Sequence, residues 1–156
     1  YSAMRGQADV VKLVGFANQV TDSISMIELM VKADSPVIAI AMGAAGMMTR
    51  LMAPCFDACL LTYASSTPTT GTAPGQITVR EMIDRFGVDR VSTDTEIDVH
   101  LYTKPTQEPA VLAICRGTGE RLHVPAQVDP EQVGTVAKTL DQLSPRIRAT
   151  LFQPHP

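Results

Sequence analysis

Residues 36–52 read PVIAIAMGAAGMMTRLM and predict the fold most directly. The apolar run Val37–Met42 is short and continuous, as in strands that are buried on both faces of a parallel sheet. Gly43–Gly46 then predicts a turn, and residues 47–52 predict a short helix that ends before Pro54. The stretch therefore predicts one β/α unit.

The sequence on the N-terminal side predicts a second unit of the same kind. Residues 8–17, ADVVKLVGFA, are rich in Val and bounded by polar residues, which suits a buried strand. Thr21 and Asp22 are expected to cap a helix that runs to the breaker Asp34-Ser35-Pro36. A strand and a helix thus precede the first unit.

The sequence on the C-terminal side predicts a third unit. Residues 57–64, DACLLTYA, predict a strand, and a loop rich in Ser, Thr and Pro leads to the capping box of Thr78 and Glu81. Gly87 is expected to end the helix that follows. The order βαβαβα implies a parallel sheet with helical crossovers, either an open doubly wound sheet or part of a barrel. Because a complete (β/α)₈ barrel takes roughly 250 residues, a barrel here would be truncated on its N-terminal side.

The pattern changes after Gly87. Residues 89–96 are polar and linker-like, and a small α/β extension is expected to follow them. Its expected elements are strands at 99–102, 110–115, 121–124 and 147–152, a hairpin turn at 117–119, and a helix opened by Asp129 and Pro130. The chain is thus predicted to divide into residues 1–88, a linker at 89–96 and the extension at 97–156.

The composition excludes several classes of protein. With 45% hydrophobic and 19% charged among its 156 residues, the chain is expected to be globular. A net charge of −3 provides no basic surface for nucleic acid or an anionic membrane, and the apolar stretch 36–48 is too short to cross a bilayer.

The chain begins at Tyr1 rather than Met. We expect a piece of a longer protein that acts in the cytoplasm, or in the plastid if it comes from a plant.

The three cysteines, Cys55, Cys59 and Cys115, do not suggest a disulfide framework. Cys55 and Cys59 are four residues apart without a neighbouring histidine, which makes a metal site improbable. Both are expected to be small core residues.

Lys12 lies in the middle of an otherwise apolar predicted strand. A lysine enclosed there must lose its proton or find a partner, because a buried ammonium is costly. A neutral lysine can attack a ketone and form an imine, which accepts electrons when a proton leaves the adjacent carbon. Composition and spacing alone favour the other interpretation, in which Lys12 reaches solvent at the end of its strand.

Two further sites have polar residues that suit a small-molecule ligand. Arg50 lies on the short helix after residues 37–42, where its planar fork could hold a carboxylate at the strand ends, or pair with a surface acid such as Asp57. The loop with Thr72 and Gln76 could present a hydroxyl and an amide to a polyhydroxylated substrate, or could be an ordinary surface loop. The glycines of residues 43–46 fit either a ligand contact or a helix-entry turn.

Taken together, these motifs resemble the last three β/α units of type I 3-dehydroquinate dehydratase. The segments that carry the resemblance are ADVVK at 8–12, MGAAGMMTR at 42–50 and APGQ at 73–76, in this order. The resemblance implies an α/β fold that is the C-terminal part, about three β/α units, of a TIM (β/α)₈ barrel. It also places Lys12 as the lysine that forms the Schiff base.

The resemblance assigns roles to the other candidate residues. Arg50 would bind the substrate carboxylate, Gln76 and Thr72 would contact ring hydroxyls, and Met42 would line the pocket beneath the ring. Thr72 stands where the family usually has serine. The implied reaction is the conversion of 3-dehydroquinate to 3-dehydroshikimate and water in the shikimate pathway of aromatic amino-acid biosynthesis. It uses no metal or organic cofactor, and its partner is this small-molecule substrate; whether the chain forms a homodimer stays open.

The resemblance has limits. The family's general base is a histidine of an earlier barrel strand, and His100, His123 and His155 cannot be carried onto it. The chain alone is therefore expected to be an inactive fragment. Residues 90–98, RVSTDTEID, resemble the connector to the shikimate dehydrogenase part of a bifunctional enzyme, but no dinucleotide-binding fingerprint follows.

Two other functions stay open at this point. The fold could serve as a non-catalytic ligand-sensing or interaction module. It could also be an imine-forming aldolase of the class I kind, which predicts a glycine-rich phosphate loop after the last strands.

Overall fold

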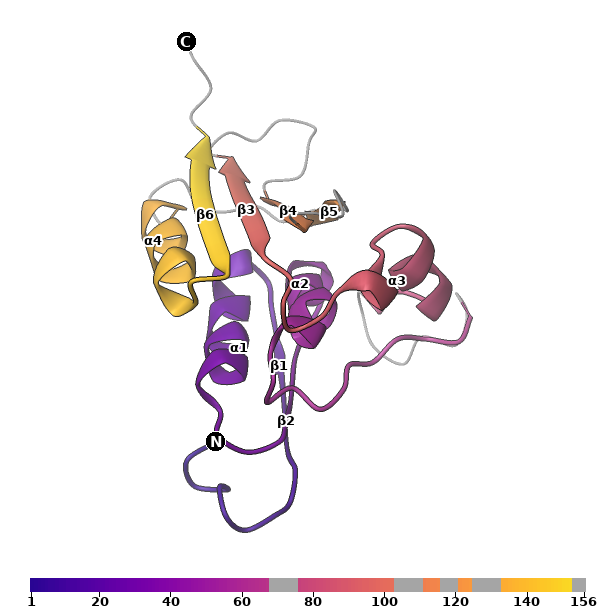
Figure 1. Cartoon of the computed structure of the whole chain (residues 1–156), viewed down its shortest axis with the longest axis vertical. Coiled ribbons are helices and arrows are strands. Elements are labelled where there is room, and N and C mark those ends of the chain that lie inside the picture. Colours follow the sequence, from indigo (N-terminus) through magenta and orange to yellow (C-terminus); the bar gives the residue numbers. More distant parts are fainter. Residues whose placement is uncertain (68–75, 103–110, 116–120, 125–132, 153–156) are drawn as a thin grey trace.

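The structure is a computed structural model that describes residues 1–67, 76–102, 111–115, 121–124 and 133–152. It contains two sheets, one with two strands and one with four (Figure 1). The elements before residue 96 are β1 (Val11–Phe16), α1 (Val20–Lys32), β2 (Val37–Met42), η1 (Ala44–Gly46), α2 (Met47–Met52), η2 (Ala53–Cys55), α3 (Val79–Asp84) and η3 (Val88–Arg90). Those after it are β3 (Ile97–Tyr102), β4 (Val111–Cys115), β5 (Arg121–Val124), α4 (Val133–Leu143) and β6 (Ile147–Phe152).

The strands β1 and β2 are parallel, as the sequence predicted, and run in register from the pair Val11 and Val37 to the pair Phe16 and Met42. The crossover between them is α1, which packs its buried face against β2. The predicted bounds of β2 and α2 are confirmed to the residue. Because the two strands are in register, alternate residues of β1 and β2 lie side by side on one face of the sheet.

The prediction of a third strand at 57–64 was wrong in extent. The segment makes two backbone hydrogen bonds with β2, from Val37 N to Ala58 O at 2.8 Å and from Leu60 N to Val37 O at 2.9 Å, but forms only an isolated bridge there. Leu60 and Leu61 are both exposed. Because the apolar side chains of this segment are not buried, little holds a longer ladder together. The segment therefore lies beside the start of β2 without forming a strand of the sheet.

The second sheet has the strand order β5-β4-β3-β6. β3 pairs in parallel with β6 and antiparallel with β4, and β4 pairs antiparallel with β5. The strand at 121–124 and the strand at 147–152 are confirmed, whereas the predicted turn at 117–119 and the helix start at Asp129 lie outside the described residues. The helix α4 lies beside β6 (Figure 1).

One hydrophobic cluster joins the elements before and after the predicted linker at 89–96. Met48 of α2 and Met30 of α1 belong to it together with Val99 of β3 and Leu140 of α4, and all four are almost fully buried. Cys55 is buried in this cluster, as predicted for a small core residue, whereas Cys59 is only partly buried and packs against the cluster. The division into two domains stays a prediction.

The first helix begins earlier than the sequence predicted. Its first residue is Val20, so the expected cap at Thr21 and Asp22 lies inside the first turn. The carboxylate of Asp22 accepts hydrogen bonds from the backbone N–H groups of Asn18 at 2.9 Å and Gln19 at 3.0 Å. Asp22 therefore accepts from the N–H groups that precede the helix instead of standing before its first residue. This explains why α1 begins at Val20, earlier than predicted.

Gly43 and Gly46 serve the turn into α2. Gly43 has a φ of +88°, and a Cβ there would lie 2.6 Å from the carbonyl oxygen of Ala17. A Cβ at Gly46 would lie 2.2 Å from the carbonyl oxygen of Ala41. Both glycines allow backbone to approach backbone, which supports the helix-entry interpretation of this motif.

In the described part of the chain, the longest helix is α1 with 13 residues, and none of the helices has the length and hydropathy needed to cross a bilayer.

Candidate active site

Lys12 lies on the face of β1 that points away from the helices. Val11 is buried while Lys12, Val14 and Phe16 are exposed, so the burial of β1 alternates along the strand. Val14 and Phe16 retain 47% and 51% of their accessible surface. The prediction of a strand buried on both faces was therefore wrong for the described residues, and the exposure of Lys12 agrees with the interpretation in which the lysine reaches solvent. The physical reason is that α1 covers one face of β1 and no described element covers the other.

The aromatic ring of Tyr63 lies against Lys12. The Lys12 Nζ atom is 4.4 Å from the centroid of this ring, within the range of a cation–π interaction. β1 lies on one side of β2, and residues 57–64 flank its other side through the bridge of Val37 and Cys59. The two side chains therefore approach each other from the two sides of β2.

The surface beneath this pair belongs to β2. By the register of the strands, Ile38 and Ile40 share the face of Lys12 and Val14. Both isoleucines are buried, whereas their partners on β1 are exposed. Lys12 and Tyr63 thus meet over an apolar floor.

Tyr63 was not singled out from the sequence, although it belongs to the segment DACLLTYA that was assigned to a strand. The available signal was an aromatic residue near the end of the stretch that was assigned to the strand after Arg50. The pairing itself could not be read from spacing, since 51 positions separate the two residues in the chain.

Arg50 is buried within α2, with 2% of its surface accessible. Burial lowers the pKa of the Arg50 guanidinium from its ordinary value, through loss of solvation. The alternative of a surface arginine does not fit this burial. Met42 ends β2 on the same face as Lys12 and is half-buried, as a residue that lines the face would be.

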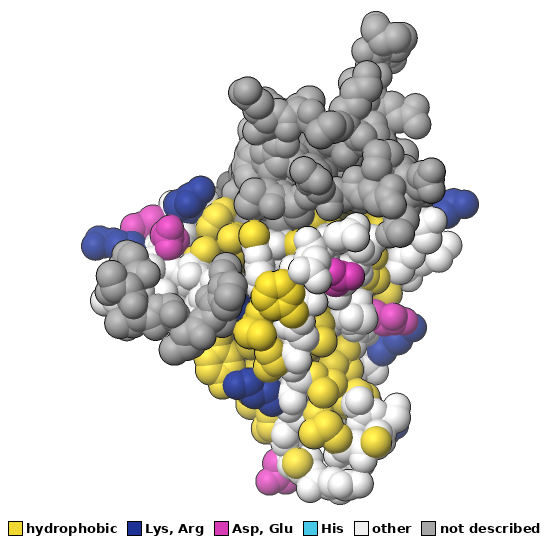
Figure 2. Space-filling view, turned by 180° about the vertical axis from the view of Figure 1, so that it is seen from behind, with side chains coloured by type: hydrophobic (Ala, Val, Ile, Leu, Met, Phe, Trp, Pro, Cys, Tyr) yellow, Lys and Arg dark blue, Asp and Glu magenta, His cyan; other side chains and the backbone are white. Residues whose placement is uncertain are grey.

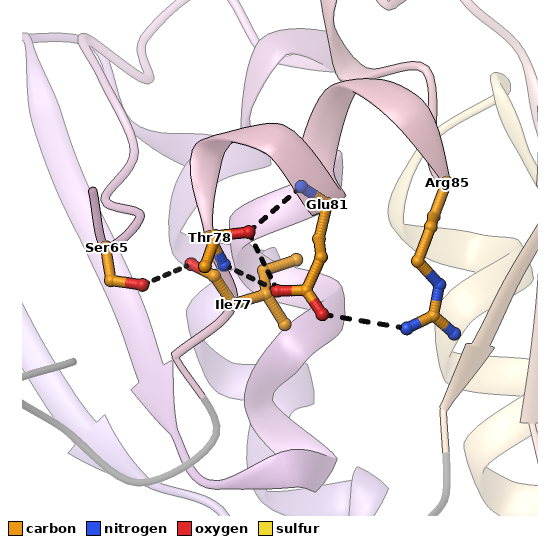
Figure 3. A network of polar contacts seen from close by, with 5 residues as sticks. All are labelled: Ser65, Ile77, Thr78, Glu81 and Arg85. Carbon is orange, nitrogen blue, oxygen red and sulfur yellow. Dashed lines mark hydrogen bonds and ion pairs between the residues drawn. The ribbon is translucent and has the colours of Figure 1, made fainter. Parts of the chain in front are cut away.

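Gln76 is half-buried and lies next to a network of polar contacts that joins the two ends of the intervening loop (Figure 3). Ser65 N donates to Ile77 O and Val79 N donates to Ser65 O, both at 2.9 Å. The Glu81 carboxylate accepts from Thr78 N and from Thr78 Oγ1, both at 2.9 Å, and Glu81 N donates to Thr78 Oγ1 at 3.0 Å. The predicted capping box is thereby confirmed.

The network fixes where the loop begins and ends. Arg85 extends it through an ion pair with Glu81 at 3.8 Å. The hydrogen bonds from Thr78 lower the pKa of the Glu81 carboxyl, first through the backbone N–H and then through the hydroxyl. Thr72 lies outside the described residues, so its predicted role is untested.

The histidines do not lie on the Lys12 face in the described part of the chain. His100 belongs to β3 in the four-stranded sheet and is half-buried. His123 is on β5, and His155 lies outside the described residues.

The face opposite to the helices is strongly apolar. Figure 2 shows hydrophobic side chains gathered along its lower part, with Lys or Arg side chains at the edge. An exposed hydrophobic surface of this kind commonly marks a binding or interaction site.

Comparisons with known proteins agree with the sequence motifs. The profile of the family "Type I 3-dehydroquinase" matches residues 1–92. A bifunctional 3-dehydroquinate dehydratase/shikimate dehydrogenase from Arabidopsis thaliana, a chloroplastic protein, is 31% identical over 90 residues, which are 58% of this chain and 15% of that protein. A 3-dehydroquinate dehydratase from Methanothrix thermoacetophila is 38% identical over 80 residues, 51% of this chain and 34% of that protein.

The solved dehydroquinate dehydratase and shikimate dehydrogenase of S. pombe aligns with 96% of this chain and 24% of its own, at a TM-score of 0.41 and 20% identity. The chain spans about a third or less of the length of the two curated relatives. The match of the family profile covers more than half of the chain. The chain therefore belongs to the type I 3-dehydroquinase family, whose fold is of the α/β TIM-barrel type.

Proposed function

We propose that this chain provides the imine-forming lysine and the carboxylate-binding arginine of a 3-dehydroquinate dehydratase, within the C-terminal part of a barrel. Family membership and the names of the two relatives support the reaction. The observation that carries the proposal is the position of Lys12, whose amine stands on the open face of β1 above buried isoleucines. In a closed barrel this face would be the interior.

The proposed chemistry begins with condensation. The Lys12 ammonium first loses a proton, and the neutral amine adds to the C3 ketone of 3-dehydroquinate. The carbinolamine that results takes up a proton and loses one molecule of water, which leaves an iminium. A base then removes the proton from C2, and the electron pair moves into the iminium to form an enamine. The C1 hydroxyl leaves with a proton as a second water molecule, and hydrolysis of the imine releases 3-dehydroshikimate and Lys12. These reaction steps require no metal or organic cofactor.

Arg50 suits the carboxylate of the substrate. An arginine keeps its charge at neutral pH even when burial lowers its pKa, since the ordinary value is very high. A buried guanidinium gains from an anion that accepts two parallel hydrogen bonds. Gln76 is proposed to contact a ring hydroxyl from the clamped end of its loop, with Thr72 as its neighbour, and Met42 is proposed to line the face beneath the ring.

The base for the proton at C2 is not assigned to this chain. Among the described residues, no histidine accompanies Lys12 on its face. We therefore propose that the chain by itself forms the imine but does not complete the elimination. The complete site would require the other strands of the barrel. We propose that the whole protein acts in the cytoplasm, or in the plastid if it comes from a plant.

Borohydride trapping tests both parts of this proposal. The chain is incubated with 3-dehydroquinate and sodium borohydride, and the intact mass is measured. Reduction of the first iminium gives an adduct that keeps the C1 hydroxyl, whereas reduction after elimination gives an adduct lighter by one water. We expect the heavier adduct, and its absence in Lys12→Ala.

The matched control is Lys32→Ala. Lys32 is also exposed, but it lies on α1 and pairs with Glu28, so its variant should be trapped like the unmodified chain. Arg50→Met should reduce trapping at low substrate concentration. Equal trapping in Lys12→Ala and in the unmodified chain would exclude Lys12 as the imine-forming residue.

The exposure of Lys12 also favours a second function, a non-catalytic ligand-sensing or interaction module. Such a module would bind a carboxylated ring through Arg50 without a covalent step. Saturable binding of 3-dehydroquinate that leaves no adduct after borohydride would support this function over the dehydratase.

A further inference from the structure

We propose that Tyr63 is a positioning residue, whose ring holds the cationic nitrogen of Lys12 in place both as the free ammonium and as the iminium. This inference rests on the proposed function, because it concerns the lysine that forms the imine. It adds a residue that the family motifs at 8–12, 42–50 and 73–76 do not contain.

The contact geometry supports this role. The Lys12 Nζ atom lies 4.4 Å from the centroid of the Tyr63 ring, and the electron-rich face of an aromatic ring attracts a cation at this distance. Tyr63 has 40% of its surface accessible, so the ring is partly fixed and one part remains open to a ligand. The ring therefore restrains a side chain that would otherwise move freely on an exposed face.

The pair also defines an approach direction. Lys12 starts on β1 and Tyr63 on the opposite side of β2, and Ile38 and Ile40 lie beneath them. A free lysine side chain samples many rotamers. If the ring already restricts these rotamers, less side-chain entropy is lost when the nitrogen reaches the ketone. A ligand can then reach the nitrogen from the open side of the sheet.

The charge of the nitrogen explains why one ring can serve two states. Condensation of an ammonium with a ketone releases water and leaves an iminium with the same single positive charge. The ring therefore interacts with the nitrogen both before and after imine formation. The interaction weakens while the nitrogen is neutral, in the attacking amine and later in the enamine.

The first test needs no activity. The ring current of Tyr63 should move the Lys12 Hε resonances of the free chain upfield in proton NMR. This shift should vanish in Tyr63→Leu and persist in Tyr63→Phe, which keeps the ring and loses the hydroxyl. Lys12 Hε resonances at the position of a solvated lysine would overturn the inference.

The second test uses trapping with 3-dehydroquinate and borohydride. Tyr63→Leu should lower the initial rate of adduct formation by about two- to five-fold, because the released lysine side chain loses more rotamer entropy when its nitrogen meets the ketone. Tyr63→Phe should restore the rate. The control Tyr1→Leu makes the same chemical change at a residue whose hydroxyl bonds Asp34 and Ser35, and should leave the rate unchanged.

The outcomes separate the two proposals. If the unmodified chain forms no adduct at Lys12, the proposed function fails and the iminium part of this inference fails with it. If the chain is trapped but Tyr63→Leu reacts at the unmodified rate, only the role of Tyr63 fails. A loss in Tyr63→Phe as large as that in Tyr63→Leu would assign the effect to the hydroxyl and overturn the role of the ring.

Discussion

Replacing Gly46 by alanine should destabilise the chain strongly, because η1 passes directly over β2. An added Cβ would lie 2.2 Å from the carbonyl oxygen of Ala41, 2.5 Å from its carbonyl carbon and 2.9 Å from its Cβ. These atoms belong to the backbone and side-chain base of a strand whose residues 37–41 are buried. No side-chain rotation can relieve such a contact, so η1 must move away from β2.

The size of the effect follows from two opposing contributions. Overpacking of a core costs typically about 1–3 kcal/mol, and a backbone contact belongs at the upper end of that range. Gly46 has a φ of −83° and a ψ of −7°, which alanine adopts without strain. Alanine therefore also restricts the unfolded chain, which returns about 0.4–1 kcal/mol. We expect a net loss of about 2 kcal/mol or more.

Urea unfolding followed by far-ultraviolet circular dichroism measures this loss. With a urea dependence of about 1–3 kcal/mol per molar, a loss of this size lowers the midpoint by roughly 1 M. The control is Gly134→Ala in α4, where an added Cβ meets nothing within 4 Å. It should stabilise by up to about 0.5–1 kcal/mol, since glycine is unfavourable in a helix. A Gly46→Ala midpoint equal to that of the unmodified chain would refute the reasoning.

Three other predictions follow from the structure. Thr78→Ala should destabilise by about 1 kcal/mol, because Thr78 Oγ1 accepts from Glu81 N. Since the pKa of Glu81 is lowered in the folded chain, its stabilising contribution is present above the ordinary value and is lost as the pH falls through the lowered one. The urea midpoint of Thr78→Ala should therefore fall less on acidification. Met48→Ala should cost about 2–5 kcal/mol, because Met48 is 0% exposed, whereas Met4→Ala at 43% exposure should change little. Lys12→Met should leave the urea midpoint nearly unchanged, because Lys12 is exposed.

Each of these three has an outcome that would contradict it. If the urea midpoint of Thr78→Ala falls on acidification as much as that of the unmodified chain, the Thr78 hydroxyl does not contribute to the lowered pKa of Glu81. Equal midpoints for the two methionine variants would contradict the position of Met48 in the core. A large loss in Lys12→Met would mean that its contact with Tyr63 is needed for folding.

The local elements were predictable where one stretch of sequence decides them. Val37–Met42 and Met47–Met52 form a strand and a helix as predicted, because their apolar runs and glycine turn act within a few residues. The capping box of Thr78 and Glu81 is equally local. In the second sheet the predicted hairpin pairing of β4 with β5 is confirmed, whereas the parallel pairing of β3 with β6 was not predicted, because it depends on contacts far apart in the chain.

The predictions that were wrong share one cause, because the sequence does not show which side chains become buried. Residues 57–64 carry strand-like side chains, yet Leu60 and Leu61 are exposed and the ladder does not extend. The strand around Lys12 was predicted to be buried on both faces because its residues are apolar, whereas alternate residues of β1 point to opposite faces and only one face is covered. Which face a neighbouring layer covers is a tertiary property. The contact between Lys12 and Tyr63 is tertiary in the same sense.

We propose that Lys12, and no other lysine, forms the imine with 3-dehydroquinate. The chain contains four lysines, Lys12, Lys32, Lys104 and Lys138. Peptide mapping of the borohydride-reduced adduct by mass spectrometry decides among them. We predict a single modified peptide that contains Lys12, with saturation as the substrate concentration rises. A modification spread over all four lysines, or absent from Lys12, would contradict the account.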